Sequence, residues 1–218
     1  MAGNRCDALV IFGATGDLAK LETFPALVGL VERGVLDFPV VGVAKSGWGL
    51  EQFRDYATAS LKLNKMDPTT PAAKKMLSLL RYVDGDLDDN ATYQAMSQAA
   101  GPGQQVLFYM EVPAFLFGRI AEGIAKAGRA GGARVMVEKP FGSDLASSEK
   151  LNETMHQYFS EDAIFRVDDW LAFDQADQRR EGFQFGQVPG CPEDHQRVAA
   201  FSCHVSFLRN DVGYLSRS

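Results

Sequence analysis

Residues 8–27 read ALVIFGATGDLAKLETFPAL, a short apolar run followed by a loop and by a segment with apolar residues at helical spacing. In the loop, Gly13, Gly16 and Ala19 form a G-x-x-G-x-x-A variant of the fingerprint that binds dinucleotides. Glycine permits a tight turn and a close approach of backbone amides to a pyrophosphate, and the start of the helix adds free N–H groups. The stretch therefore predicts a strand, an anion-binding loop and a helix that ends near Gly34.

The same alternation of strand and helix continues along the chain. Further apolar runs, rich in Val, Ile and Phe, cover residues 40–43, 80–83, 106–110, 134–138 and 163–167, and helical spacing recurs in residues 50–63 and 143–159. Runs that are apolar on both faces are typical of parallel strands covered by helices. We therefore predict an α/β fold, a doubly wound Rossmann-type parallel sheet in residues 1–174, with a short C-terminal extension in residues 175–218.

Composition excludes several classes of partner. The chain has 218 residues, of which 46% are hydrophobic, and a formal net charge of −6, so nucleic acid is not an expected partner. It holds no apolar run of the roughly 18 residues that a membrane span needs. The three cysteines lack the spacing of a metal site, and their odd number favours reduced thiols in a cytoplasmic protein.

The end of the second predicted strand bears on the choice of coenzyme. Sites for NAD usually place an acidic residue there for the ribose hydroxyls, but this chain has Lys45 and Ser46. A lysine and a hydroxyl suit the additional 2′-phosphate of NADP. The alternative is that Lys45 is an ordinary solvent-exposed lysine.

Several separate motifs resemble those of the glucose-6-phosphate dehydrogenase family. VIFGATGDLAK, FPALVGLVERGVL, VVGVAKSGW, LFYMEVP, RVMVEKPFGSDLASSEKLN and FRVDDWLAF occur in the expected order and at about the expected spacing. The resemblance extends over roughly residues 5–174, the coenzyme domain of that family. It implies a Rossmann fold and the use of NADP.

The resemblance also implies roles for individual residues. The family binds NADP through the loop that matches residues 13–20, a basic residue that matches Lys45, and a strand end that matches Val112 and Pro113. The cofactor-binding residues expected here are therefore Gly13, Thr15, Gly16, Asp17, Leu18, Lys45, Ser46, Pro113 and Lys139. Lys139, in EKPFG, is expected between the nicotinamide and the substrate. The family's substrate domain also implies a homodimer.

The substrate motif departs from the family pattern. The family's RIDHYLGKE is RVDDWLAFD here, so Asp169, Trp170 and Phe173 replace a histidine, a tyrosine and a lysine. Similarly, Glu22 replaces the second lysine of GDLAKxK. A like-charge contact at 4 Å costs roughly 4 kcal/mol at an effective dielectric constant near 20. These replacements therefore predict that a sugar phosphate is rejected.

Our first hypothesis is a divergent NADP-dependent oxidoreductase that acts on a small neutral or cationic molecule, such as an amine, an imine or an amino sugar. Glu22, Asp168 and Asp169 would then line an acidic pocket. Trp170 and Phe173 would add apolar or cation–π walls. Lys139, helped by Asp168 or Asp169, would orient the substrate or transfer a proton.

Two alternatives remain open at this point. One is a non-catalytic NADP(H)-binding or regulatory protein, and the other is a truncated glucose-6-phosphate dehydrogenase. Truncation would account for the unusual residues after 174. It does not explain the substitutions at Glu22 and Asp169, which lie before them.

Overall fold

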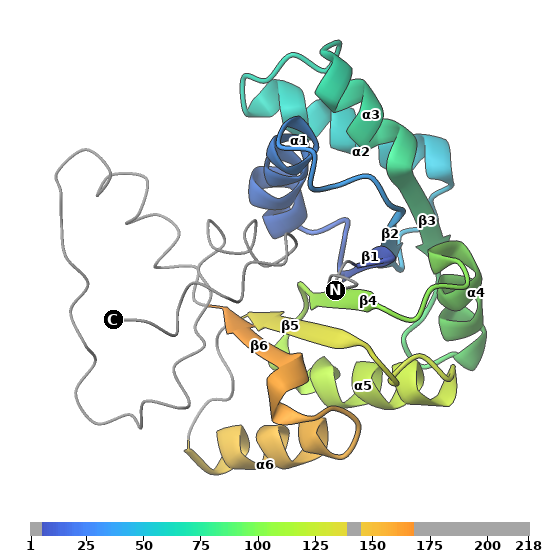
Figure 1. Cartoon of the computed structure of the whole chain (residues 1–218), viewed down its shortest axis with the longest axis vertical. Coiled ribbons are helices and arrows are strands. Elements are labelled where there is room, and N and C mark those ends of the chain that lie inside the picture. Colours follow the sequence, from blue (N-terminus) through green and yellow to red (C-terminus); the bar gives the residue numbers. More distant parts are fainter. Residues whose placement is uncertain (1–5, 139–144, 168–218) are drawn as a thin grey trace, which may run out of the picture.

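The apolar runs form a six-stranded parallel sheet in the computed structural model, which describes residues 6–138 and 145–167 (Figure 1). The strands are β1 (Ala8–Phe12), β2 (Val40–Ala44), β3 (Leu80–Asp84), β4 (Val106–Met110), β5 (Arg134–Glu138) and β6 (Ile164–Val167). Their order is β3-β2-β1-β4-β5-β6, so the direction of strand addition reverses between β1 and β4. The predicted doubly wound Rossmann-type fold is confirmed.

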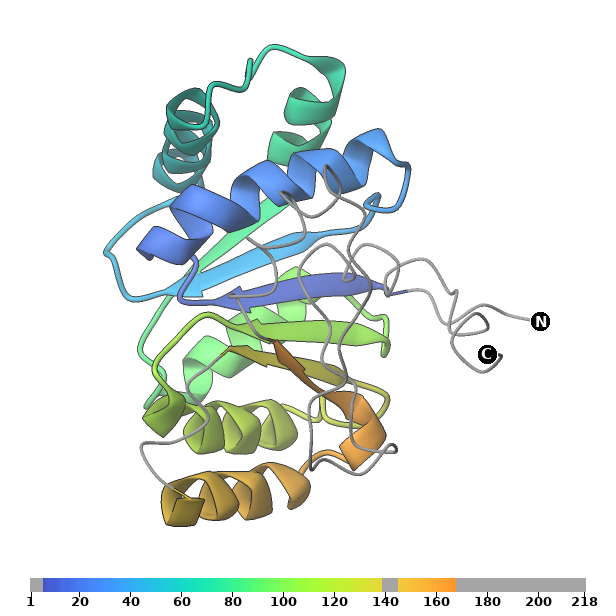
Figure 2. The ribbon, with the colours of Figure 1, turned by 90° about the vertical axis from the view of Figure 1, so that its left-hand side faces the viewer.

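Helices cover both faces of the sheet (Figure 2). The helices are α1 (Phe24–Glu32), α2 (Leu50–Leu63), α3 (Pro71–Leu79), α4 (Asn90–Ala100), α5 (Phe117–Lys126) and α6 (Leu145–His156), with short turns η1 (Ala19–Thr23), η2 (Ala114–Leu116) and η3 (Glu161–Ala163). One hydrophobic cluster joins α1, α2 and α3 to the sheet, and a second joins α4, α5 and α6 to the opposite face. All five residues of β1 and of β4 are buried, which explains why these strands are continuously apolar.

The helix predicted for residues 16–34 is divided in the structure. Its first part contains the π-helical turn η1, and α1 begins only at Phe24. Pro25 is the physical reason, because it has no N–H to offer to the carbonyl groups of the preceding turn. The carbonyl oxygen of Lys20 instead accepts hydrogen bonds from the Ser60 hydroxyl and, at 3.3 Å, from the Asn64 amide of α2. The turn that follows the glycine loop is therefore attached to α2.

Smaller differences occur near the end of the described chain. Strand β6 begins at Ile164, one residue later than predicted, because Ala163 belongs to the turn η3. Helix α6 ends at His156, three residues before the end of the helix predicted for residues 143–159, because the amides of residues 157 and 158 bond only three residues back and form a turn. The predicted domain boundary between residues 174 and 175 lies outside the described residues. No helix in the described ranges is long and apolar enough to cross a membrane.

Gly42 lets α2 approach the centre of the sheet. It lies in β2, and a Cβ atom built there would collide with the ring of Phe53 and lie 3.0 Å from the Cβ atom of Ala14. Phe53 is fully buried, so its ring has no room to move aside. The absence of a side chain at Gly42 therefore allows α2 and the loop after β1 to pack against the same strand.

We expect Gly42→Ala to lower the free energy of unfolding by about 1–3 kcal/mol, the usual cost of overpacking a core. Gly131→Ala is the matched control, because a Cβ atom at Gly131 meets open space. Urea unfolding of both variants measures the difference. If Gly42→Ala is as stable as Gly131→Ala, the described packing of Phe53 against β2 is wrong.

Candidate functional site

Gly13 forms the turn at the carboxyl end of β1, at the point where the strand order reverses. Its φ is +84°, and a Cβ atom there would collide with the carbonyl oxygen of Glu111 at the end of β4. The amide of Gly13 donates to Val43 at 2.9 Å, and the amide of Gly16 donates to Gly13 at 2.8 Å. Only glycine fits this backbone conformation at this distance from β4. The turn therefore has the backbone form of a dinucleotide-binding loop, with the amides of Gly13 and Gly16 bound within the protein.

Aromatic side chains on one side hold this loop. The hydroxyl oxygen of Tyr56, on α2, lies 3.0 Å from the carbonyl oxygens of both Thr15 and Gly16. The ring of Tyr56 packs against that of Trp48, with 5.2 Å between the centroids, and Nζ of Lys20 lies 5.6 Å from the Tyr56 centroid. Burial, with smaller contributions from Asp17 and Glu111, raises the pKa of Tyr56, which keeps its hydroxyl a donor at neutral pH.

The loops after β1 and β2 meet through their hydroxyl groups. Oγ1 of Thr15 lies 2.8 Å from Oγ of Ser46. The neighbouring residue, Lys45, directs its ammonium group to Oδ2 of Asp86 at 2.7 Å. This pair is exposed, with 74% of the Lys45 side chain and 43% of the Asp86 side chain accessible. The hydrogen bond and the charge of Asp86 raise the pKa of Lys45, so a cation and two hydroxyls lie at this edge.

Asp84, the last residue of β3, organises the loop after β2. Its Oδ1 accepts hydrogen bonds from the amides of Ser46 and Gly47, each at 2.8 Å. These amides favour the charged carboxylate, and they hold the pKa of Asp84 below its ordinary value. The backbone donors of this loop are therefore already bound to a carboxylate of the protein itself.

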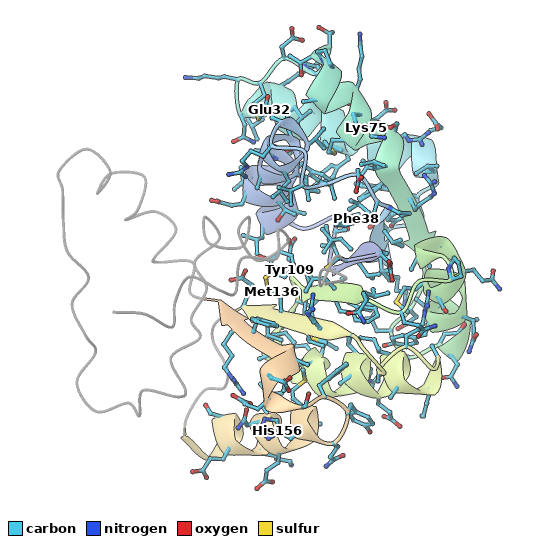
Figure 3. The ribbon with its side chains drawn as sticks, in the orientation of Figure 1. Glu32, Phe38, Lys75, Tyr109, Met136 and His156 are labelled. Atoms are coloured by element: carbon cyan, nitrogen blue, oxygen red, sulfur yellow. The ribbon has the colours of Figure 1, made fainter. Side chains whose placement is uncertain are left out.

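Two more carboxylates lie at the carboxyl ends of β4 and β5. Glu111 accepts a hydrogen bond from the hydroxyl of Thr23 at 2.5 Å, and Glu138 accepts one from the hydroxyl of Tyr109. Tyr109 is paired with Met136 across β4 and β5, and Figure 3 shows the two side chains together. Thr23 belongs to η1, so this contact holds the turn after the glycine loop against the end of β4.

The structure brings most of the predicted coenzyme residues to one edge. Gly13, Thr15 and Gly16 lie in the loop after β1, and Lys45 and Ser46 lie beside it at the end of β2. Asp17 and Leu18 form the helical turn that follows the loop, and Pro113 is exposed after β4 next to half-buried Val112.

The predicted reacting centre is described only in part. Glu22 is half-buried in η1, one residue before the threonine that contacts Glu111. The other predicted catalytic and substrate residues lie outside the described residues: Lys139, Asp168, Asp169, Trp170 and Phe173.

Three residues at the edge were missed by the sequence reasoning: Tyr56, Asp84 and Asp86. A signal for the two acids was present, because both follow the third apolar run. In the sheet order of this fold, the third strand lies directly beside the second, so its carboxyl end faces Lys45. Tyr56 had no comparable signal, since an aromatic residue at helical spacing is usually part of the core.

A separate cavity of about 620 Å³ lies between α5, α6 and β6. Within it, Glu161 contacts Arg166 at 2.7 Å and His156 at 2.6 Å, and Arg166 lowers the pKa of Glu161. Figure 3 shows His156 on α6, far from Tyr109. The cavity belongs to the face that α4, α5 and α6 cover, so it is not part of the edge formed by the loops after β1 and β2.

The geometry of the edge fits a dinucleotide coenzyme. A glycine at positive φ, a helix start and a crevice at the reversal of strand order are the features that bind a pyrophosphate in this fold. Lys45 with the hydroxyls of Thr15 and Ser46 adds the donors that a further phosphate group would need.

Comparison with known proteins identifies the same region. A family model described as "Glucose-6-phosphate dehydrogenase, NAD binding domain" matches residues 10–176. The "Glucose-6-phosphate 1-dehydrogenase 1" of Mycobacterium bovis is 39% identical over 170 residues, which cover 78% of this chain and 36% of that protein. The "Glucose-6-phosphate 1-dehydrogenase 6, cytoplasmic" of Arabidopsis thaliana is 32% identical, with 76% of this chain and 36% of that protein covered.

Solved structures agree with these matches. A crystal structure of glucose-6-phosphate 1-dehydrogenase from Mycobacterium avium has a TM-score of 0.73 at 39% identity, over 77% of this chain and 37% of that one. A glucose-6-phosphate dehydrogenase in complex with glucose 6-phosphate has a TM-score of 0.69 at 30% identity, over 79% and 38% of the two chains. The chain thus spans little more than a third of the length of these relatives.

The depressed pKa of Asp84 predicts an acid-dependent contribution to stability. Because the folded pKa lies below the unfolded one, this contribution is present above the ordinary pKa of 3.8 and is lost as pH falls through the folded pKa. We expect Asp84→Asn to lower the free energy of unfolding at pH 7 by less than about 1 kcal/mol, because the carboxylate is exposed.

Urea unfolding at pH 7 and near pH 3, together with a carboxyl ¹³C titration, measures this effect. Asp162→Asn, which removes an exposed charge near β6, controls for net charge. An Asp84 carboxyl that titrates at or above 3.8, its ordinary pKa, would contradict the assignment of its amide partners.

Proposed function

The chain belongs to the glucose-6-phosphate dehydrogenase family, and from this premise we propose that it binds NADP(H) across the ends of β1, β2 and β4 for hydride transfer. NADP is the coenzyme of this family. The observation that carries the proposal is the position of Gly13, at positive φ and against the Glu111 carbonyl, beside a cluster of hydroxyl and ammonium groups.

Different residues would bind different parts of the coenzyme. The amides of Ala14 and Thr15 in the loop, with the helical turn at Asp17 and Leu18, would hold the pyrophosphate. Lys45, Thr15 and Ser46 would hold the 2′-phosphate. When bound, NADP supplies the hydride acceptor or donor, and the chain's own residues hold and orient it.

The strand end at Val112 and Pro113 would support the coenzyme near its reacting end. Lys139 would lie between coenzyme and substrate, where an amine can orient a substrate or move a proton. Asp168 or Asp169 would assist it. These three assignments come from the resemblance and from the type of residue, and they remain predictions.

The substrate class that we propose is neutral or cationic, namely an amine, an imine or an amino sugar. Two observations support it. Glu22, Asp169 and Phe173 occupy positions that are cationic in the family pattern. Thr23, which follows Glu22, holds a second carboxylate, Glu111, against the same turn. A dianionic sugar phosphate would meet like charges there.

Assembly and location are proposed on the same premise. A homodimer is expected because the family forms one through its substrate domain. A cytoplasmic location agrees with reduced thiols, and Cys6 is a buried free thiol whose pKa is raised by burial.

We expect Gly13→Ala to weaken NADPH binding by at least about tenfold, because the new methyl group collides with the Glu111 carbonyl and distorts the loop. Gly34→Ala is the control, since Gly34 also has a positive φ, +69°, but its Cβ atom would meet open space. Fluorescence titration with NADPH and NADH measures both variants. The proposal fails if the wild-type chain prefers NADH, or binds neither nucleotide.

Glucose 6-phosphate should give no NADPH in an absorbance assay with the full 218-residue chain, because the carboxylates at Glu22 and Asp169 repel a phosphate group. NADPH binding, measured on the same preparation, shows that the protein is competent. Measurable turnover would instead favour the alternative that the chain is part of a glucose-6-phosphate dehydrogenase. NADPH binding without turnover of any amine, imine or amino sugar would favour the non-catalytic alternative.

A further inference from the structure

The sheet register brings the ends of β2 and β3 together. Ala44 pairs with Asp84, and the amide of Gly85 donates to the carbonyl of Ala44 at 3.0 Å, which extends the parallel ladder beyond the strand ends. As a consequence, Asp86 lies opposite Lys45, and their side chains meet at 2.7 Å. The contact between Lys45 and Asp86 therefore follows from the pairing of β2 with β3.

The two acids at this edge do different things. Asp84 is bound to the amides of Ser46 and Gly47, so its carboxylate fills the backbone donors of the loop after β2. Asp86 uses Oδ1 to accept a hydrogen bond from the amide of Asp88 at 3.0 Å, and Oδ2 to bind Lys45. Lys45 is therefore paired with the Asp86 carboxylate where the coenzyme's 2′-phosphate would bind, and the neighbouring loop amides are occupied by Asp84.

We propose that Asp86 weakens the preference of this site for NADP over NAD, because it holds Lys45 in the free protein and opposes the 2′-phosphate of the bound coenzyme. A phosphate monoester carries a charge of about −1.5 to −2 at pH 7. The 2′-phosphate of NADP would have to share Lys45 with the Asp86 carboxylate, and it would be repelled by the negative charge of that carboxylate. NAD, whose ribose carries a hydroxyl at the same position, meets neither cost. Asp86 therefore narrows the preference for NADP over NAD.

This inference rests on the proposed NADP function, and one substitution tests it without measuring activity. Asp86→Asn removes the charge but keeps an oxygen that accepts from the Asp88 amide. Calorimetric titration of the full chain with NADP⁺, NAD⁺, 2′,5′-ADP and 5′-AMP separates the 2′-phosphate from the rest of the coenzyme.

We expect Asp86→Asn to tighten NADP⁺ and 2′,5′-ADP binding by about three- to tenfold in low salt, with NAD⁺ and 5′-AMP changed by less than about twofold. The gain should shrink in 1 M salt, where the screening length falls to about 3 Å. Asp162→Asn, an equal change of charge near β6 at the other edge of the sheet, should leave all four affinities unchanged.

The outcomes distinguish a failure of the role proposed for Asp86 from a failure of the proposed coenzyme function. If the wild-type chain binds NADP⁺ but Asp86→Asn leaves its affinity unchanged, or tightens NAD⁺ equally, the role of Asp86 is overturned and the coenzyme function stands. If neither protein binds NADP⁺, both fail. Asp86→Ser, whose hydroxyl can also accept the Asp88 amide, repeats the test should the asparagine variant not fold.

Discussion

The architecture of the site depends on one close contact, that between the backbone of Gly13 and the carbonyl of Glu111. Strands β1 and β4 are neighbours, and the direction of strand addition reverses between them, which is where doubly wound folds bind their ligands. A side chain at Gly13 would collide with the Glu111 carbonyl at this point. Because residue 13 is glycine, the loop can lie against the end of β4 before the helical turn that starts at Asp17. Tyr56, on α2, holds the loop through its hydroxyl group. Thr23, in η1, holds the following turn against Glu111 at the end of β4.

The charged groups at the carboxyl ends of β2 and β3 lie close together because of the register between these two strands. In a parallel sheet, residues just beyond adjacent strand ends face one another. Lys45 is therefore placed beside Asp86, which follows β3, and the amides of the next two residues are placed beside Asp84, the last residue of β3. The lysine alone indicates a site for a 2′-phosphate, whereas the lysine with its neighbours indicates a site whose attraction for that phosphate is partly cancelled.

Much of this structure was predictable from the sequence. Strands β1, β4 and β5 and helix α2 have the predicted bounds, because continuous apolar runs and helical spacing are strong local signals. The π-helical turn before Pro25 was missed, since its cause is a carbonyl group that finds its donors on α2, a contact distant in sequence. Asp84 and Asp86 were missed for a similar reason. They matter only because the strand order places β3 beside β2, and no single apolar run indicates that order. The predicted reacting and substrate residues that lie outside the described ranges stay predictions: Lys139, Asp168, Asp169, Trp170 and Phe173.

Amide ¹H–¹⁵N chemical shifts of the full chain, recorded as NADP⁺ is added, test the central claim most directly. A coenzyme that binds across the ends of β1, β2 and β4 should shift the amides of Gly13 to Gly16, Ser46 and Gly47 most strongly. The amide chemical shifts of residues that line the cavity between α5, α6 and β6, such as Asn152 and His156, should not change. Shifts concentrated in that cavity, or no saturable shifts at all, would contradict the account.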